Sequence, residues 1–206
     1  MLRSLFYSII NVLIPMRERE ARVASLTAED LEMLRMNPPA GGGLPYHDLR
    51  ITALIWELKY KANSKALRLA GEFLSEELLG IASEEIGKPL LVPVPMHSAR
   101  KKIRGYNQTE LLCEAVLRCG SADAYDYTPD ILVRVKDTAS QQTLARAKRL
   151  TNVKNSMHVT NPKLVEGRVC VVLDDVSTTG ATLAEAARAL KKAGARRVHT
   201  VALARS

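Results

Sequence analysis

Two adjacent carboxylates, Asp174 and Asp175, lie directly before a loop rich in hydroxyl groups in the stretch VVLDDVSTTGAT, residues 171–182. Gly180 can adopt backbone angles closed to other residues, which lets successive N–H groups of the loop converge on one anion. The start of a helix after the loop would add a favourable dipole. The hydroxyl groups would supply further donors. The loop therefore predicts a site for a phosphate monoester that includes Ser177, Thr178, Thr179 and Thr182.

The two acids would repel that phosphate if they touched it. They fit a neighbouring part of the same ligand that carries hydroxyls or a metal, because a carboxylate accepts two hydroxyl hydrogen bonds or binds Mg²⁺. A ribose 5-phosphate would meet both demands, with its phosphate in the loop and its 2- and 3-hydroxyls on the acids.

Three other interpretations of the acidic pair fit less well. A Walker B strand would need a GxxxxGK[ST] sequence, which the chain does not contain. A phosphoacceptor site would need more than the ~30 residues that follow the acids to complete a receiver fold. A helix capped by Ser or Thr would explain one hydroxyl but neither the adjacent acids nor the other hydroxyls.

The elements around this stretch indicate how it is positioned. The run RVCVVLDD, residues 168–175, is typical of a buried parallel strand, Leu183, Ala187 and Leu190 share one face of a helix, and RVHTVAL, residues 197–203, alternates like a strand. A strand, loop, helix and strand in this order form parallel sheets with right-handed crossovers. Open sheets of this kind bind ligands at the end of the strand. The sequence therefore predicts an α/β fold.

Upstream, apolar residues at helical spacing predict helices at residues 48–61 and 64–79, and a further helix is expected at 109–117. The runs PLLVPVP, residues 89–95, and ILVRV, residues 131–135, indicate strands. The polar segment 136–149 fits either a loop or a helix. Nearer the N-terminus, Thr27 followed by Asp30 predicts a capped short helix.

The run NPPAGGGLP, residues 37–45, interrupts regular structure. It divides the chain into a helical N-terminal segment with a linker, residues 1–45, and a main domain, residues 46–206. Residues 1–16 fit a short helix docked on the main body, with a weak contact to a membrane surface as the alternative. They are too short for a spanning helix and lack a small-residue cleavage site, so we expect neither a membrane span nor secretion.

Composition narrows the class of protein less than the motifs do. The net charge of +8 favours an anionic partner, which could be nucleic acid, a membrane surface or a phosphorylated small molecule. An aromatic content of 4% leaves little material for stacking single-stranded bases, and no nucleic-acid motif is present. The 3 cysteines have no CxxC spacing, which argues against a disulfide framework or a zinc site and fits a reducing cytoplasm.

The stretch VVLDDVSTTGAT resembles the phosphoribosyl-pyrophosphate (PRPP) motif of type I phosphoribosyltransferases. A second stretch, VPVPMHSARKKIRGYNQTELL at residues 92–112, resembles the signature of the ComF competence family within that superfamily. Both motifs lie in the expected order, and the resemblance covers residues 46–206. It implies a twisted, mainly parallel sheet flanked by helices, with a small helical N-terminal segment.

The resemblance also implies roles for single residues. Asp174 and Asp175 would bind the ribose hydroxyls of PRPP, which enters with Mg²⁺. The 5-phosphate would be bound by Ser177, Thr178, Thr179, Gly180, Ala181 and Thr182. The pyrophosphate would be bound by Met96, His97, Ser98, Arg100 and Arg104. A flexible hood that closes over the ligand would include Arg134, Lys136, Thr138, Gln141 and Arg149.

Simpler interpretations of some of these residues remain open. The basic residues 100–104 also fit a solvated turn, and His97 fits a surface loop. Asn107 is expected to cap a helix. Lys59, Tyr60 and Lys61 match a "KY" feature of the family but equally fit an exposed helix end. The four-cysteine zinc module common in ComF relatives has no counterpart, because no cysteine precedes Cys113.

The expected function is transfer of a phosphoribosyl group from Mg-PRPP to an unidentified acceptor, with release of pyrophosphate. The alternative is a non-catalytic ComF-like protein that binds PRPP or a nucleotide, or acts in DNA uptake. A homodimer is among the expectations, although no motif specifies it.

Overall fold

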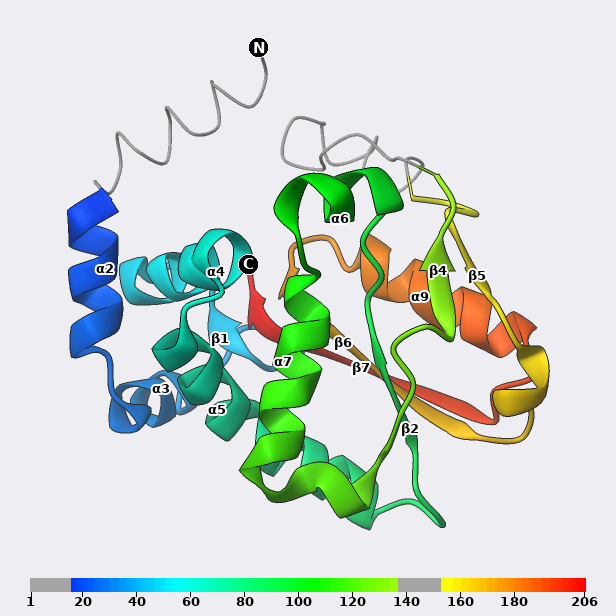
Figure 1. Ribbon diagram of the computed structural model, residues 1–206. Helices are drawn as coiled ribbons and strands as arrows, with labels where there is room; N and C mark the ends of the chain where they lie inside the picture. The colour runs from blue at the N-terminus through cyan, green and yellow to red at the C-terminus, as the bar shows by residue number, and fades with distance from the viewer. Residues whose placement is uncertain (1–15, 137–152) are drawn as a thin grey trace.

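The computed structural model describes residues 16–136 and 153–206, and its centre is a five-stranded parallel sheet (Figure 1). The strands in sheet order are β1 (Leu44–Pro45), β7 (Arg197–Arg205), β6 (Val169–Ser177), β2 (Leu90–Pro93) and β3 (Asp126–Tyr127). β6 is buried along almost its whole length, as expected of a strand covered on both faces. The predicted α/β class is therefore confirmed.

Helices cover both faces of the sheet (Figure 1). Val171 and Leu173 of β6 pack into a core cluster that also contains residues of helices α4 (Leu49–Lys61), α5 (Ser64–Ser83) and α7 (Gln108–Val116). Cys170 and Val172 point to the opposite face, where they pack with residues of α9 (Ala181–Lys192). This alternation follows from the period of two in a strand.

The expected helices and strands of the main body are present, with some differences at their ends. α5 continues to Ser83, and β6 continues past both acids to Ser177. The segment after β2, where no helix or strand was predicted, contains a helix, α6 (Ser98–Arg104). The expected strand at 131–135 is β4 (Leu132–Arg134), which pairs antiparallel with β5 (Met157–Val159) outside the main sheet. The remaining short elements are η1 (Leu117–Ser121), η2 (Ala122–Ala124) and η4 (Pro162–Leu164).

Two helices precede β1, namely α2 (Met16–Ser25) and α3 (Ala28–Arg35). The predicted capping box is present: the Thr27 hydroxyl accepts the Asp30 N–H, and the Asp30 carboxylate accepts the Thr27 N–H. Val23, Leu26 and Leu31 belong to the same core cluster as α4 and α5. The helix expected within residues 1–16 lies outside the described residues, except for Met16 at the start of α2.

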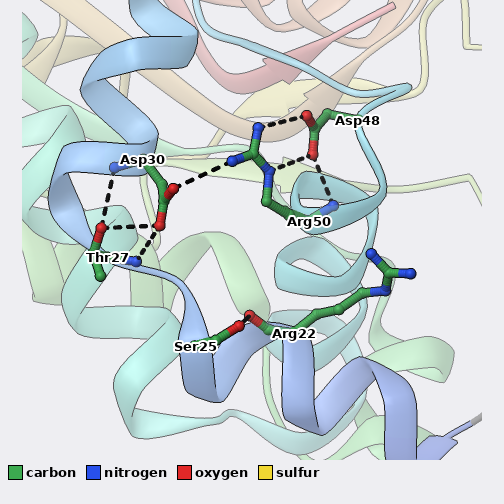
Figure 2. A network of polar contacts seen from close by, with 6 residues as sticks. All are labelled: Arg22, Ser25, Thr27, Asp30, Asp48 and Arg50. Carbon is green, nitrogen blue, oxygen red and sulfur yellow. Dashed lines mark hydrogen bonds and ion pairs between the residues drawn. The ribbon is translucent and has the colours of Figure 1, made fainter.

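An arginine links the first turns of α3 and α4 (Figure 2). The Arg50 guanidinium lies 3.3 Å from Asp30 Oδ1 and 2.9 Å from Asp48 Oδ2. Asp48 caps α4 through the Arg50 N–H, and Asp30 belongs to the capping box of α3. One guanidinium therefore joins two helix N-termini and sets how α3 meets the main body.

Within the described residues, no helix is long and apolar enough to span a bilayer.

Candidate functional site

A cleft of about 250 Å³ opens at the carboxyl ends of β2 and β6. It is lined by residues from the end of α4, the β2–α6 connection, the start of α7, β4, the end of β6 and the start of α9. This is the edge at which open parallel sheets bind ligands. The pairing of β6 with β2 ends at Leu173. The next two residues of β6, both acids, therefore lie beyond the end of β2.

The structure brings half of the predicted site residues to this cleft. Asp174 and Asp175 line it together with Thr178 and Thr182 of the predicted phosphate loop. From the predicted pyrophosphate set, the residues that line it are Met96, His97, Arg100 and Arg104, and Arg134 comes from the predicted hood.

The other predicted residues lie elsewhere. Ser98 begins α6, and Lys136 is exposed after β4. Ser177 and Ala181 are buried at the two ends of the phosphate loop. Gly180 and Thr179 belong to the same loop without lining the cleft. Thr138, Gln141 and Arg149 fall outside the described residues.

The two acids are buried and held in place by protein donors. Their residues are 6% and 4% exposed, respectively. The Asp175 N–H donates to Asp174 Oδ1 over 2.9 Å, and Gln108 Nε2 donates to Asp175 Oδ2 over 2.9 Å. Lys59 Nζ lies 3.3 Å from the same Asp175 oxygen. Burial, and next the charge of Asp175, raise the pKa of Asp174 well above its ordinary value, against the opposing effect of Lys59.

The loop after the acids has the backbone geometry expected of an anion site. Gly180 has a φ of +72°, in the left-handed region, and immediately precedes α9. The first N–H groups of an α-helix have no acceptor in a preceding turn. In the loop, the Ala181 N–H donates to the Thr179 hydroxyl over 3.4 Å. Thr178 and Thr182, which both carry hydroxyl groups, line the cleft. Hydroxyl and N–H donors therefore converge at the positive end of a helix dipole.

The opposite wall of the cleft is basic. Arg104 donates to the Gln108 side-chain oxygen and lies over the Tyr60 ring at 5.2 Å from its centroid. Arg134 Nε donates to the Pro95 carbonyl over 3.1 Å, which ties β4 to the β2–α6 connection. His97 caps α6 by accepting the Ala99 N–H. The alternative of a solvated turn is wrong for the backbone of residues 100–104, which lies in α6; Lys101 and Lys102 are exposed, whereas Arg100 and Arg104 line the cleft.

A group of hydrogen bonds between polar residues connects this wall to the sheet. Asn107 caps α7, as predicted, by accepting the Thr109 N–H. The Asn107 amide and the Thr109 hydroxyl both donate to the Val94 carbonyl, over 3.1 Å and 2.6 Å. These bonds satisfy a buried carbonyl just past β2. They also place Gln108 against Asp175.

Sequence reasoning missed two contributions to the site. The side chain of Gln108, to which the sequence analysis gave no role in the site, binds Asp175. Lys59 and Tyr60 were left open as an exposed helix end; that description holds for Lys61, but the Lys59 side chain is only 18% exposed and faces the acids. The only signal available for both residues was the family resemblance.

Comparison with known proteins identifies the family to which the chain belongs. The family described as phosphoribosyl transferase domain matches residues 88–206, and the chain therefore belongs to this family. The DNA utilization protein YhgH of Salmonella typhi is 35% identical over 162 residues, covering 76% of this chain and 67% of that protein. Competence protein F of Haemophilus influenzae is 36% identical over 118 residues, covering 56% of this chain and 50% of that protein. These relatives support a ComF-type phosphoribosyltransferase-like protein.

Among solved structures, hypoxanthine phosphoribosyltransferase from Trypanosoma cruzi is similar with a TM-score of 0.42 and 12% identity. The match covers 67% of this chain and 63% of the other.

The raised pKa of Asp174 makes stability depend on pH in a defined direction. Because this carboxyl has a higher pKa in the folded chain than in the unfolded one, the stability that it contributes is present below the unfolded pKa and is lost as pH rises through the folded pKa. Asp174→Asn does not titrate. As the pH is raised from 5 to 8, the free energy of unfolding of the variant is therefore expected to increase relative to that of the wild type. Urea unfolding of both proteins at the two pH values measures this difference. A constant difference between the two proteins would contradict the raised pKa.

Proposed function

We propose that the protein binds Mg-PRPP in this cleft and transfers the phosphoribosyl group to an acceptor with release of pyrophosphate. The observation that carries the proposal is the juxtaposition of two buried carboxylates with a helix-terminal phosphate loop, facing a wall of arginines. The acids are suited to accept hydrogen bonds from hydroxyl groups, and the loop is suited to bind a phosphate group. A ribose 5-phosphate carries both.

Each part of PRPP has a counterpart among the lining residues. The ribose hydroxyls would bind Asp174 and Asp175, and the 5-phosphate would bind the 177–182 loop. The pyrophosphate would lie toward the β2–α6 connection, where Arg100 and Arg104 supply positive charge. Bound Mg²⁺ would supply charge neutralisation of the leaving pyrophosphate.

The chemistry of the donor set fits a metal that enters with its substrate. Within the described residues, no group of three His, Cys, Asp or Glu side chains is arranged to hold a metal ion. The phosphate oxygens of PRPP would supply ligands of the kind that Mg²⁺ prefers, and the two acids are proposed as the hydroxyl acceptors of the ribose.

The residues of the chain would act mainly by positioning and electrostatics. Two fixed carboxylates would hold the sugar and stabilise positive charge as C1 develops oxocarbenium character. The C1–O bond to pyrophosphate breaks, the electron pair leaves with the pyrophosphate, and the acceptor forms the new bond to C1. Arg100 and Arg104 would stabilise the leaving anion.

The test has two stages. Isothermal titration should give a measurable dissociation constant for PRPP with Mg²⁺, and weaker binding when the metal is chelated. Pyrophosphate release is then measured with a panel of nucleobases and amines as acceptors. Absence of PRPP binding to the wild type would sink the proposal, and binding without release across the panel would favour a sensor.

A second candidate function is a role in DNA uptake or use. It is favoured by the similarity to proteins named for DNA utilization and competence and by the net charge of +8. An electrostatic DNA-binding surface predicts an affinity that falls steeply with salt. DNA binding that is insensitive to salt would contradict this candidate.

We also infer a reducing compartment such as the cytoplasm. Cys113, Cys119 and Cys170 are free thiols, and burial raises the pKa of both Cys113 and Cys170. Two buried thiols are consistent with a protein that needs no disulfide.

The phosphate loop offers a matched pair of glycine variants. Gly180 and Gly167 have φ values of +72° and +69°, and a Cβ at either position would meet no atom within 4 Å. Alanine at either position is therefore expected to cost about 1–2 kcal/mol through backbone strain alone. Only Gly180→Ala should also weaken Mg-PRPP binding, by about tenfold or more, because it disturbs the converging donors. Equal affinities of the two variants in isothermal titration would argue against a phosphate in this loop.

A further inference from the structure

The cleft receives one wall from a helix that lies outside the segment matched by the family. That segment begins at residue 88, whereas α4 ends at Lys61. α4 nevertheless places Lys59 and Tyr60 in the cleft. The matched segment therefore does not contain Lys59.

The position of Lys59 is set by the way α4 ends. Ala62 adopts the left-handed conformation with a φ of 46°, and its N–H donates to the Glu57 carbonyl, which closes the helix. The Tyr106 hydroxyl donates to the Leu58 carbonyl over 3.3 Å and connects this helix end to the segment that carries Gln108. Lys59 thus lies in the last turn of α4, where the helix dipole favours a cation.

Lys59 and Gln108 meet on the same carboxylate oxygen. Lys59 Nζ lies 3.3 Å and Gln108 Nε2 2.9 Å from Asp175 Oδ2. Asp174 Oδ1 is engaged by the Asp175 N–H. One oxygen of each acid is thereby held by the protein. The other two, Asp174 Oδ2 and Asp175 Oδ1, accept no hydrogen bond from the described residues and can receive ligand hydroxyls.

Charge gives Lys59 a second role. Two adjacent buried carboxylates repel each other, and PRPP would bring more negative charge into the same cleft. Burial lowers the pKa of Lys59, but the attraction of Asp175, followed by smaller contributions from Tyr46, Asp174 and Tyr60, outweighs it, so its pKa lies above the ordinary value. Arg134 is the other cation that acts on the Asp174 carboxyl, and its effect on the pKa of that group is smaller than that of Lys59.

We propose that Lys59 is a positioning residue for the ribose subsite, one that holds the Asp175 carboxylate oriented with Oδ1 toward the ligand and supplies positive charge beside the acid pair. The proposal rests on the proposed function, since the ligand is PRPP. It assigns part of the site to α4 rather than to the segment matched by the family.

The test is a double-mutant cycle with Mg-PRPP affinity as the readout. Lys59→Met is expected to weaken binding by about tenfold, in the range of coupling energies for contacting residues. In an Asp175→Asn background the same substitution should have almost no further effect, because Asp175 is the residue through which Lys59 acts. Lys59→Arg should recover most of the affinity. The matched control is Lys61→Met, since Lys61 is exposed two positions further along α4.

Two outcomes would overturn the proposal: wild-type affinity in Lys59→Met, or penalties that multiply in the double variant. Circular dichroism and the melting temperature check the fold of each variant, and Lys59→Gln replaces Lys59→Met if the latter does not fold. A purely structural lysine would lower the melting temperature without the coupling to Asp175.

A measurement without ligand separates this inference from the proposed function. In the free protein, ¹³C NMR of the aspartate carboxyls follows the titration of Asp174, whose pKa the charge of Lys59 lowers. The neutral Lys59 variants should shift that titration to higher pH than in wild type or Lys61→Met. If the wild type does not bind PRPP, the proposed function fails and this titration still decides the role of Lys59: an unchanged titration would overturn it.

Discussion

Replacing both Asp174 and Asp175 by asparagine is expected to abolish measurable Mg-PRPP binding. Each carboxylate would accept a charge-assisted hydrogen bond from a ribose hydroxyl, and such bonds contribute about 1.5–3 kcal/mol each. Losing two of them lowers affinity by at least about a hundredfold. Isothermal titration with wild type and variant measures the loss directly.

The fold of this double variant should survive. Asparagine has nearly the shape of aspartate, and it removes the repulsion between two buried charges. Asp123→Asn is the matched control, since Asp123 is exposed in η2 and does not line the cleft. Wild-type affinity in a folded Asp174→Asn/Asp175→Asn protein would mean that the ribose is bound elsewhere.

The largest effect on stability is expected from Gly43→Ala, just before β1. Gly43 has a φ of +79°, and a Cβ there would lie 2.6 Å from the Ala202 carbonyl oxygen and 3.3 Å from that of Leu203, both in β7. Left-handed backbone costs an alanine about 1–2 kcal/mol, and overpacking adds about 1–3 kcal/mol. The sum lowers the melting temperature by roughly 5–15 °C in a protein of this size.

Gly42→Ala separates the two contributions to that loss. Gly42 has a φ of +83°, but a Cβ there would meet nothing within 4 Å. Its alanine variant should show only the backbone cost, about 1–2 kcal/mol. Thermal unfolding of both variants compares them. If Gly43→Ala unfolds no earlier than Gly42→Ala, the close approach of this segment to β7 is wrong.

Much of the fold could be predicted from the sequence because its elements carry strong local signals. The apolar run before the acids and the helical face of Leu183 and Leu190 specify the β6–α9–β7 unit without knowledge of the rest of the chain. α6 was missed because seven residues with no buried side chain give no apolar periodicity to detect. The antiparallel pairing of β4 with β5 was not predicted, because β5 lies beyond the polar segment 136–149.

The residues of the candidate site likewise differ in how far they could be predicted from local sequence. Asp174, Thr178 and Thr182 lie within one stretch of nine residues, so one motif was enough to group them. Lys59 and Gln108 reach Asp175 from sequence separations that no motif spans. Their contact depends on where α4 ends and on how Asn107 caps α7, which are consequences of tertiary packing.

The cleft is assembled from stretches around Lys59, Pro95 to Gln108, Arg134 and Asp174 to Thr182. Contacts between such distant stretches form only after large loops have closed, and closing them costs chain entropy. No partly folded intermediate of the chain would therefore contain the complete cleft. A ligand that needs all of these stretches binds only the fully folded chain, and at a hundred times its dissociation constant it would add about 2.7 kcal/mol to the stability of that state.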